Sequence, residues 1–295
     1  MDARGGPAPV GGWNGNGAPR ASRSARSLLF TVVGEYLRDP GSALWTAGAV
    51  AALGRLGVEE RAARQALTRT ARDGWLVAER HGRRTLWRLT SRAADHFAES
   101  AESVYRARRH PTGWNGDWTV LVTSVPESRR ELRHRLRTRL RWAGFGPLGQ
   151  GVWISPRVGS EQAARHVLDE LGLTASAVSV IGRIGGLGSE FEVVNRAWDL
   201  GGLARDYAAF AAEFSDRRER TEREPAVVFT EQTRMVHRWR EFALRDPVLP
   251  ADLLPARWPG HDARDLFFRR HDADHRIAAA WLGALSQGAT GPAGP

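Results

Sequence analysis

The sequence contains no cysteine and no lysine. Without cysteine the chain can form neither disulfide bonds nor thiolate zinc sites, so any metal site must be built from His, Asp and Glu. The absence of cysteine is also consistent with a reducing compartment. The positive charge comes entirely from arginine, a bias that we take to indicate a GC-rich bacterial genome.

Long hydrophobic runs are also missing. The uncharged, mostly apolar run at residues 41–54 is too short to span a bilayer and follows no signal-peptide pattern. We therefore expect a cytoplasmic protein without a membrane partner. A hydrophobic content of 42% over 295 residues is enough for two or three domains with ordinary cores.

Positive charge is concentrated toward the N-terminal side. Residues 25–92 contain 12 arginines against 6 acidic residues, residues 117–198 contain 11 against 8, and residues 199–290 contain 14 against 15. An uneven basic surface is expected of a protein that binds a polyanion. The alternative is a soluble protein whose surface is simply rich in arginine.

Three helices followed by a hairpin are predicted within residues 25–92. The helical patterns cover 27–39, 46–57 and 58–74, and the strand patterns cover 75–79 and 84–89. This order is that of a winged helix-turn-helix domain. In such a domain the third helix enters the major groove, and the hairpin wing lies along the backbone or minor groove.

The predicted third helix has two different faces. At 100° per residue, Ala63, Ala66, Leu67 and Thr70 fall on one side, which is small and mostly apolar. The other side carries groups that can contact guanine, adenine or phosphate. The DNA-binding residues expected there are Arg61, Arg64, Gln65, Thr68, Arg69 and Arg72. A solvated helix with its charges outward is the alternative.

The turn RHGR of the hairpin presents further basic side chains together, which an isolated hairpin does not need in order to fold. The residues expected to grip DNA there are Arg80, His81, Arg83 and Arg84. Trp75, Trp87 and Leu89 are expected to hold the wing to the core instead of stacking on bases. Helix and wing together predict binding to double-stranded DNA.

A small α/β domain is predicted over residues 117–198. A strand before Pro126, a helix, a strand, a second helix and a third strand follow one another. This order favours a ferredoxin-like sandwich. The arginine run at 129–141 on the first helix forms either a solvated outer face or a second surface for the DNA backbone.

Three parts of the chain resemble the PaaX-type transcriptional repressors of aromatic-acid catabolism, in the right order. Residues 27–90 resemble the N-terminal domain of that family, residues 117–156 its middle domain, and HRWREFALRDPVLPADLLPARWPGHDARDLF at 237–267 its C-terminal signature. The resemblance implies that the winged domain binds operator DNA and that the middle domain pairs two copies. It also implies that an aryl-acyl-CoA such as phenylacetyl-CoA releases the DNA.

We therefore expect a homodimeric repressor of a catabolic operon that is not an enzyme and needs no cofactor. Two winged domains related by a two-fold axis read an inverted repeat. A regulator of another pathway with a different effector, or with none, is the alternative.

An enzymatic alternative comes from the middle domain, because that domain of the family is similar to small CRISPR-associated nucleases. Those nucleases need an acidic residue at the end of the first strand to hold a divalent metal. This chain has Val122, Thr123, Ser124 and Val125 there. A metal-dependent nuclease is thus a remote alternative, and no catalytic residue is predicted.

An acyl-CoA effector needs cations for its phosphates and an apolar wall for its acyl group. The segment 237–260 offers both beside a proline-rich turn. The effector-binding residues expected there are His237, Arg238, Arg240, Arg257 and Trp258. Alternatively, this turn only fixes the packing of helices.

The stretch HDADH at 271–275 places His271 and His275 one helical turn apart, with Asp272 and Asp274 between them. Such a pair can bind zinc. Apart from the more distant His261, the sequence offers no further ligand near it, so a surface helix without metal is expected.

These patterns predict an α+β protein. The expected domains are a disordered tail (1–24), a winged helix-turn-helix domain (25–92), a linker helix (93–116), a ferredoxin-like dimerisation domain (117–198), a helical C-terminal domain with possible effector binding (199–290) and a disordered tail (291–295).

Overall fold

The computed structural model describes six segments: residues 24–39, 41–105, 113–157, 159–215, 223–243 and 245–288. The predicted tails lie outside these residues except for Ser24, as does part of the predicted linker. The chain is α+β and forms two compact units. The first unit contains residues 1–103, 217–241 and 267–295, and the second contains residues 104–216 and 242–266.

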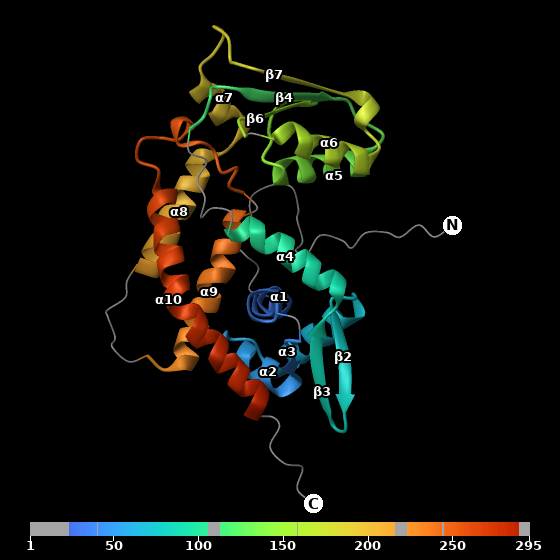
Figure 1. Cartoon of the computed structure of the whole chain (residues 1–295), viewed down its shortest axis with the longest axis vertical. Helices are drawn as coiled ribbons and strands as arrows, with labels where there is room; N and C mark the ends of the chain where they lie inside the picture. Colours follow the sequence, from blue (N-terminus) through green and yellow to red (C-terminus); the bar gives the residue numbers. More distant parts are fainter. Residues whose placement is uncertain are drawn as a thin grey trace, which may run out of the picture. The chain divides into compact units, whose positions relative to one another are not determined.

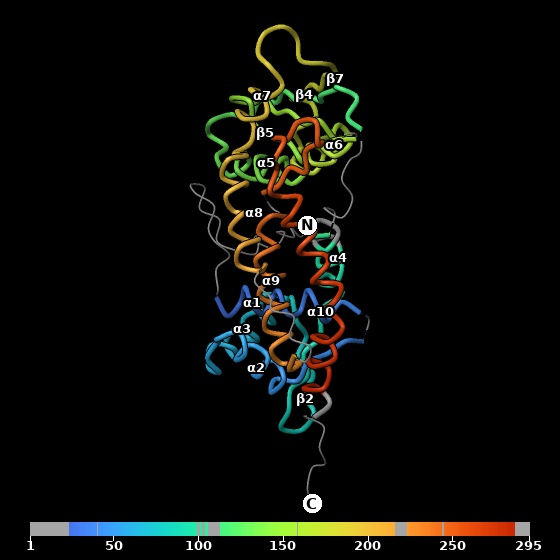
Figure 2. The backbone as a smooth tube through the Cα atoms, turned by 90° about the vertical axis from the view of Figure 1, so that its left-hand side faces the viewer, coloured from blue at the N-terminus to red at the C-terminus, as the bar shows by residue number. Residues whose placement is uncertain are grey.

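The N-terminal part of the first unit is a three-helix cluster with a small sheet. Its elements are α1 (Ala25–Tyr36), β1 (Leu44–Trp45), α2 (Thr46–Arg55), α3 (Glu60–Arg72), β2 (Leu76–His81), β3 (Arg84–Leu89) and α4 (Ser91–Tyr105). Figures 1 and 2 show the helices α1 to α3 packed together, with the β2–β3 hairpin extending beyond them. The three strands are antiparallel in the order β1-β3-β2.

Local signals set these boundaries. The Ser24 side chain caps α1 by accepting a hydrogen bond from the backbone N–H of Ser27. The predicted helices and strands are confirmed to within a few residues, with two exceptions. The two-residue strand β1 was not predicted. The hairpin turn is shorter than predicted, because Arg80 and His81 belong to β2 and only Gly82 and Arg83 connect the two strands.

The second unit contains a four-stranded sheet. Its elements are β4 (Trp118–Thr123), α5 (Arg130–Trp142), β5 (Gly146–Gly149), β6 (Val152–Ser155), α6 (Ser160–Leu171), the 3₁₀ turn η2 (Thr174–Ser176), β7 (Ala177–Gly182), α7 (Glu190–Ala197) and α8 (Leu200–Ser215). The strand order is β5-β6-β4-β7, and every neighbouring pair is antiparallel. The strand β5 and the helix α7 were not predicted.

Helices α5 and α6 cover one face of this sheet (Figure 1). Leu136 and Leu140 from α5 and Leu168 from α6 are buried with Leu121 and Trp153 from the strands. The leucine stripe predicted on the first helix is therefore the side of α5 that faces the sheet, while its arginines point away.

The described residues between 199 and 288 are mainly helical, as predicted, but they are shared between the two units. The remaining elements are α9 (Pro225–Ala243), the 3₁₀ turn η3 (Ala251–Leu253) and α10 (Pro259–Gly288). The unit boundaries fall inside α9 and α10. None of the described helices is both long enough and apolar enough to cross a membrane.

Candidate nucleic-acid interface

Helix α3 has one buried face and one exposed face. Ala63, Ala66, Leu67 and Thr70 are buried and, apart from Thr70, belong to the core that α1 and α2 share. The small alanine side chains let α3 lie close to its neighbours. The division of the helix predicted from the 100° spacing is confirmed.

All six residues predicted to contact DNA from this helix are exposed, namely Arg61, Arg64, Gln65, Thr68, Arg69 and Arg72. The guanidinium of Arg64 pairs with Glu60 one turn earlier, at 2.7 Å. Both side chains are exposed, so this pair contributes little to stability. The exposed face thus has a strong positive charge and a planar donor set that matches base edges and phosphates.

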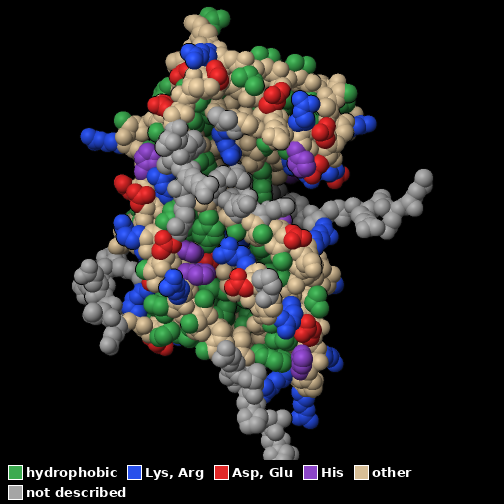
Figure 3. Space-filling view, in the orientation of Figure 1, with side chains coloured by type: hydrophobic (Ala, Val, Ile, Leu, Met, Phe, Trp, Pro, Cys, Tyr) green, Lys and Arg blue, Asp and Glu red, His purple; other side chains and the backbone are tan. Residues whose placement is uncertain are grey.

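The end of the β2–β3 hairpin is a second exposed basic surface. Arg80, His81, Arg83 and Arg84 are all exposed, and Figure 3 shows basic side chains gathered over this end of the hairpin. Gly82 has φ of 60°, a value suited to the first position of a type II′ turn. The tight turn brings the four side chains within one short segment.

The hairpin is held to the helices by aromatic contacts. Trp75 lies edge-on against Phe30 of α1, with ring centroids 5.2 Å apart. Trp87 donates a hydrogen bond from Nε1 to Thr46 Oγ1 at 2.9 Å, and Leu89 packs against the same core. These residues hold the hairpin to the core, as predicted, so α3 and the hairpin pack on the same core.

The arginine run on α5 is partly engaged within its own unit. Arg139 pairs with Glu170 of α6, and Arg133 donates to the Glu127 carbonyl at 3.0 Å. Arg130, Arg135 and Arg137 are exposed. Both interpretations of this run, a solvated face and a second DNA surface, stay open.

The predicted effector residues fall in both units. His237, Arg238 and Arg240 lie in the first unit, while Arg257 and Trp258 lie in the second. His237 is buried with Nδ1 2.8 Å from Thr31 Oγ1 of α1, and Arg238 pairs with Glu241. The Arg257 side chain is exposed.

Hydrogen bonds to Asp246 hold the proline-rich turn after α9 in place. Tyr207 donates to Asp246 Oδ2 at 2.5 Å, and Asp246 Oδ1 accepts from the Val248 amide at 2.7 Å. Burial raises the pKa of both Tyr207 and Asp246. Trp258 packs edge-on against Tyr207 at 5.9 Å. Val248 has φ of 51°, which is strained for a β-branched residue.

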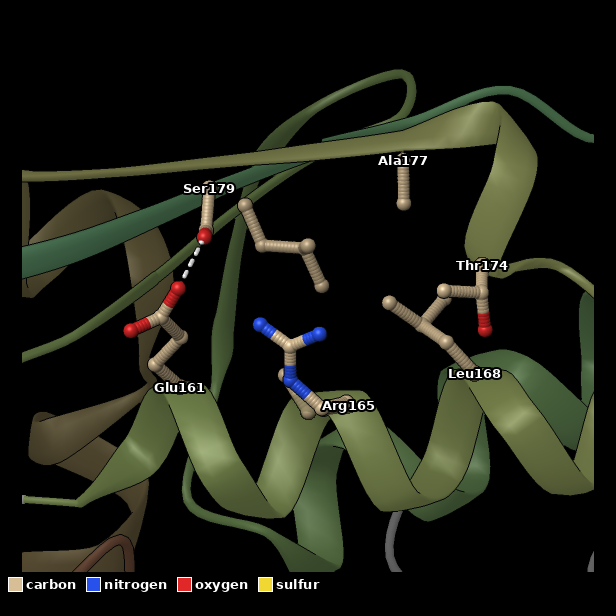
Figure 4. A pocket seen from close by; sticks show the side chains of 8 residues that line it. Glu161, Arg165, Leu168, Thr174, Ala177 and Ser179 are labelled. Carbon is tan, nitrogen blue, oxygen red and sulfur yellow. Dashed lines mark hydrogen bonds between the residues drawn. The ribbon is translucent and has the colours of Figure 1, made fainter.

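A small pocket lies between α6 and β7 (Figure 4). Glu161, Arg165, Leu168, Thr174 and Ser179 are among its lining residues, and its volume is about 80 Å³. Pockets for drug-sized ligands measure roughly 300–1,000 Å³. This pocket is therefore too small for an acyl-CoA.

One apolar surface was missed at the sequence level. Val122 of β4 pairs with Val178 of β7, and Val180 is next along the same face. Their exposed fractions are 48%, 64% and 58%. The alternation of valines in AVSV was the available signal, since it predicts one apolar and one polar face.

The place where a nuclease needs its metal ligand is the end of β4. Thr123 is the last residue of that strand, and its amide donates to the Gly151 carbonyl at 2.8 Å. Val122, Ser124 and Val125 beside it carry no carboxylate either. No observation at this strand end favours the nuclease alternative.

Three family models match consecutive parts of the chain. The model described as "PaaX-like protein" matches residues 24–93, "PaaX protein central Cas2-like domain" matches residues 111–194, and "PaaX-like protein C-terminal domain" matches residues 198–284. The order of the three matches is that of the domains predicted from sequence.

A curated relative and a solved structure are also similar over most of the chain. The transcriptional repressor PaaX of Escherichia coli (strain K12) is 29% identical over 274 residues, which cover 90% of this chain and 84% of that protein. The uncharacterized protein Rv0674 from Mycobacterium tuberculosis is 24% identical, with a TM-score of 0.59 over 88% of this chain and 99% of its own. The second likeness concerns the fold alone.

Substitutions on the two faces of α3 should differ in how much they change stability. Leu67→Ala removes a buried side chain and should lower the free energy of unfolding by about 2–5 kcal/mol. Arg69→Ala, on the exposed face, should change it by less than about 0.5 kcal/mol. Urea denaturation followed by circular dichroism measures both. A large loss in Arg69→Ala would mean that this face is packed instead of free.

Proposed function

This chain belongs to the PaaX family, and from that membership we propose that it is a DNA-binding transcriptional repressor. We extend the proposal to a homodimer that binds an inverted repeat and releases it when an aryl-acyl-CoA such as phenylacetyl-CoA binds. Residues 24–93, 111–194 and 198–284 match the family models. The observation that carries the proposal is the pairing of the exposed face of α3 with the basic wing.

The arrangement of the N-terminal elements supports DNA reading by a winged helix-turn-helix. A major groove about 12 Å wide admits one α-helix. The exposed face of α3 carries arginines and Gln65, and the burial of its alanine face fixes the orientation of the helix. The adjacent hairpin carries Arg83 and Arg84, which are both exposed. In a winged helix-turn-helix the wing lies on the backbone or minor groove, so we propose that α3 reads bases and that the hairpin contacts the backbone.

The central sheet supports pairing of two copies. The sheet order β5-β6-β4-β7 supports the proposed ferredoxin-like fold for this domain. Strand β7 lies at the sheet edge, and Val122, Val178 and Val180 form an exposed apolar face beside it. An exposed apolar edge strand favours association. A two-fold axis at this surface presents two winged domains to an inverted repeat.

The C-terminal signature supports an effector role less directly. An acyl-CoA carries phosphates that need cations, and Arg257 is exposed next to the buried Trp258. Strained backbone is frequent at ligand-binding segments, and Val248 adopts such a conformation in the same turn. The contact of His237 with Thr31 links α9 to α1 within the DNA-binding unit.

The first prediction separates base contacts from backbone contacts. Gln65→Ala and Arg69→Ala should each weaken binding to a duplex selected by the wild type from a random pool, by about 1–3 kcal/mol per lost base contact. Arg83→Ala should weaken selected and random duplexes alike, and should reduce the salt slope by about one. Fluorescence anisotropy at several salt concentrations measures these effects.

Arg269→Ala is the matched control, because Arg269 is an exposed arginine on α10 and its loss changes the net charge equally. If Arg69→Ala and Arg269→Ala bind the selected duplex with equal affinity, α3 is not the reading helix.

The second prediction concerns the valine face of the central sheet. Val180→Asp should weaken self-association by about 100-fold or more, because a buried charge without a partner costs several kcal/mol. Ile277→Asp alters a half-exposed apolar residue on α10 and should leave the dimer intact. Sedimentation equilibrium measures both. A monomeric wild type, or a dimeric Val180→Asp, would contradict pairing through β7.

The third prediction concerns the effector. Phenylacetyl-CoA added to the complex with the selected duplex should lower DNA affinity by about 5–150-fold, the usual size of a coupling between two sites. Free CoA and acetyl-CoA are the controls for the aryl group. If phenylacetyl-CoA has no effect, the chain is a regulator with a different effector or with none, while the DNA-binding proposal stands.

A further inference from the structure

Two histidines of α10 converge on a buried carboxylate of α1. His271 Nε2 lies 2.8 Å from Glu35 Oε1, and His275 Nδ1 lies 2.9 Å from the same oxygen. The two imidazole rings are stacked, with centroids 4.9 Å apart. All three residues belong to the first unit, although Glu35 and His271 are 236 positions apart along the chain. The prediction of a surface helix at 271–275 is wrong for His271 and Asp274, which are buried.

Glu35 is a buried carboxylate that faces two imidazole rings. Its side chain is only 3% exposed, and a carboxylate removed from water is costly unless a cation or several donors compensate it. A ring nitrogen of each imidazole faces this carboxylate, and such a nitrogen can supply a lone pair to a metal ion. A divalent cation among the three groups compensates the carboxylate and uses both lone pairs.

The geometry fits a small transition-metal ion. One ligand atom from each residue lies within 4.8 Å of the other two. In a tetrahedral zinc site with bonds of about 2.0–2.2 Å, ligand atoms lie roughly 3.3–3.5 Å apart. The observed gaps of 2.8 and 2.9 Å need to widen by only about half an ångström. Although His275 Nδ1 is this close to Glu35, it makes no hydrogen bond within the described part of the chain.

Neighbouring acidic residues have other roles. Asp274 pairs with Arg223, and Arg223 also contacts Glu231. Asp272 lies 3.7 Å from His271 Nδ1, on the side of the ring away from Glu35. The ligand set is therefore two histidines and one glutamate.

We propose that Glu35, His271 and His275 bind one Zn²⁺ ion that links α10 to the C-terminal end of α1. His275 is 30% exposed, so the site opens toward solvent on that side and leaves room for water as the fourth ligand. Two His and one Glu suit zinc, whereas Mg²⁺ prefers oxygen ligands in an octahedral arrangement. The ion ties the C-terminal helix to the unit that carries α3.

The test uses the full-length protein without a histidine tag, stripped of metal by a chelator and dialysed. Co²⁺ replaces Zn²⁺ as the spectroscopic probe, since tetrahedral Co²⁺ absorbs visible light strongly and octahedral Co²⁺ absorbs it weakly. One Co²⁺ per chain with tetrahedral absorption, displaced by Zn²⁺, is expected. Zn²⁺ in excess, but not Mg²⁺, should raise the thermal midpoint by roughly 5 °C or more.

Variants identify the ligands. His275→Ala and Glu35→Gln should lower Co²⁺ affinity by more than about 100-fold, beyond the 10- to 100-fold loss that follows removal of a group that only orients a ligand. His166→Ala is the matched control, because His166 is exposed on α6 and pairs with Glu170. It should bind Co²⁺ like the wild type.

Circular dichroism shows whether each variant folds, and His275 is the most exposed of the three residues, so its replacement disturbs the core least. A wild type that gives no tetrahedral Co²⁺ absorption overturns the proposal whatever the variants do. Unchanged absorption in folded His275→Ala overturns it as well.

Discussion

The orientation of α3 depends on the burial of its small apolar face. Ala63, Ala66 and Leu67 pack into the core shared with α1 and α2, and this contact fixes which side chains point outward. Because successive residues on a helix are 100° apart, burial of that face leaves the arginines and Gln65 exposed together. The hairpin adds its basic end only because Trp75 and Trp87 bind it to the same core. Without this packing the ten basic and polar residues form no common surface.

Helix α1 also makes polar contacts with the C-terminal helices α9 and α10. Thr31 contacts His237, Tyr36 Oη lies 3.0 Å from Thr233 Oγ1, and Glu35 meets His271, all inside the first unit. Burial raises the pKa of Tyr36 far above its ordinary value, so its hydroxyl stays protonated and available as a donor. Polar contacts with fixed partners specify how α9 and α10 lie on α1. A change in how α9 or α10 packs on α1 therefore acts on the core that positions α3.

Local patterns were predictable from sequence, and pairings between distant residues were not. The two faces of α3 and the leucine stripe of α5 follow from helical spacing alone. The strand β1 has two residues and exists only because Leu44 pairs with Trp87 of β3, so it leaves no periodic signal. Glu35 resembles an ordinary polar residue near a helix end until the fold brings His271 beside it. The division of residues 199–290 between two units has the same cause, since long-range packing decides it.

We propose that the exposed face of α3 and the end of the wing touch duplex DNA. A photoreactive amino acid placed at position 65, 83 or 269 of the full chain, irradiated with the duplex selected by the wild type, tests it directly. Covalent protein–DNA adducts at positions 65 and 83, and none at 269, are the predicted result. Adducts at 269 with none at 65 and 83 would contradict the assignment of the DNA-binding surface.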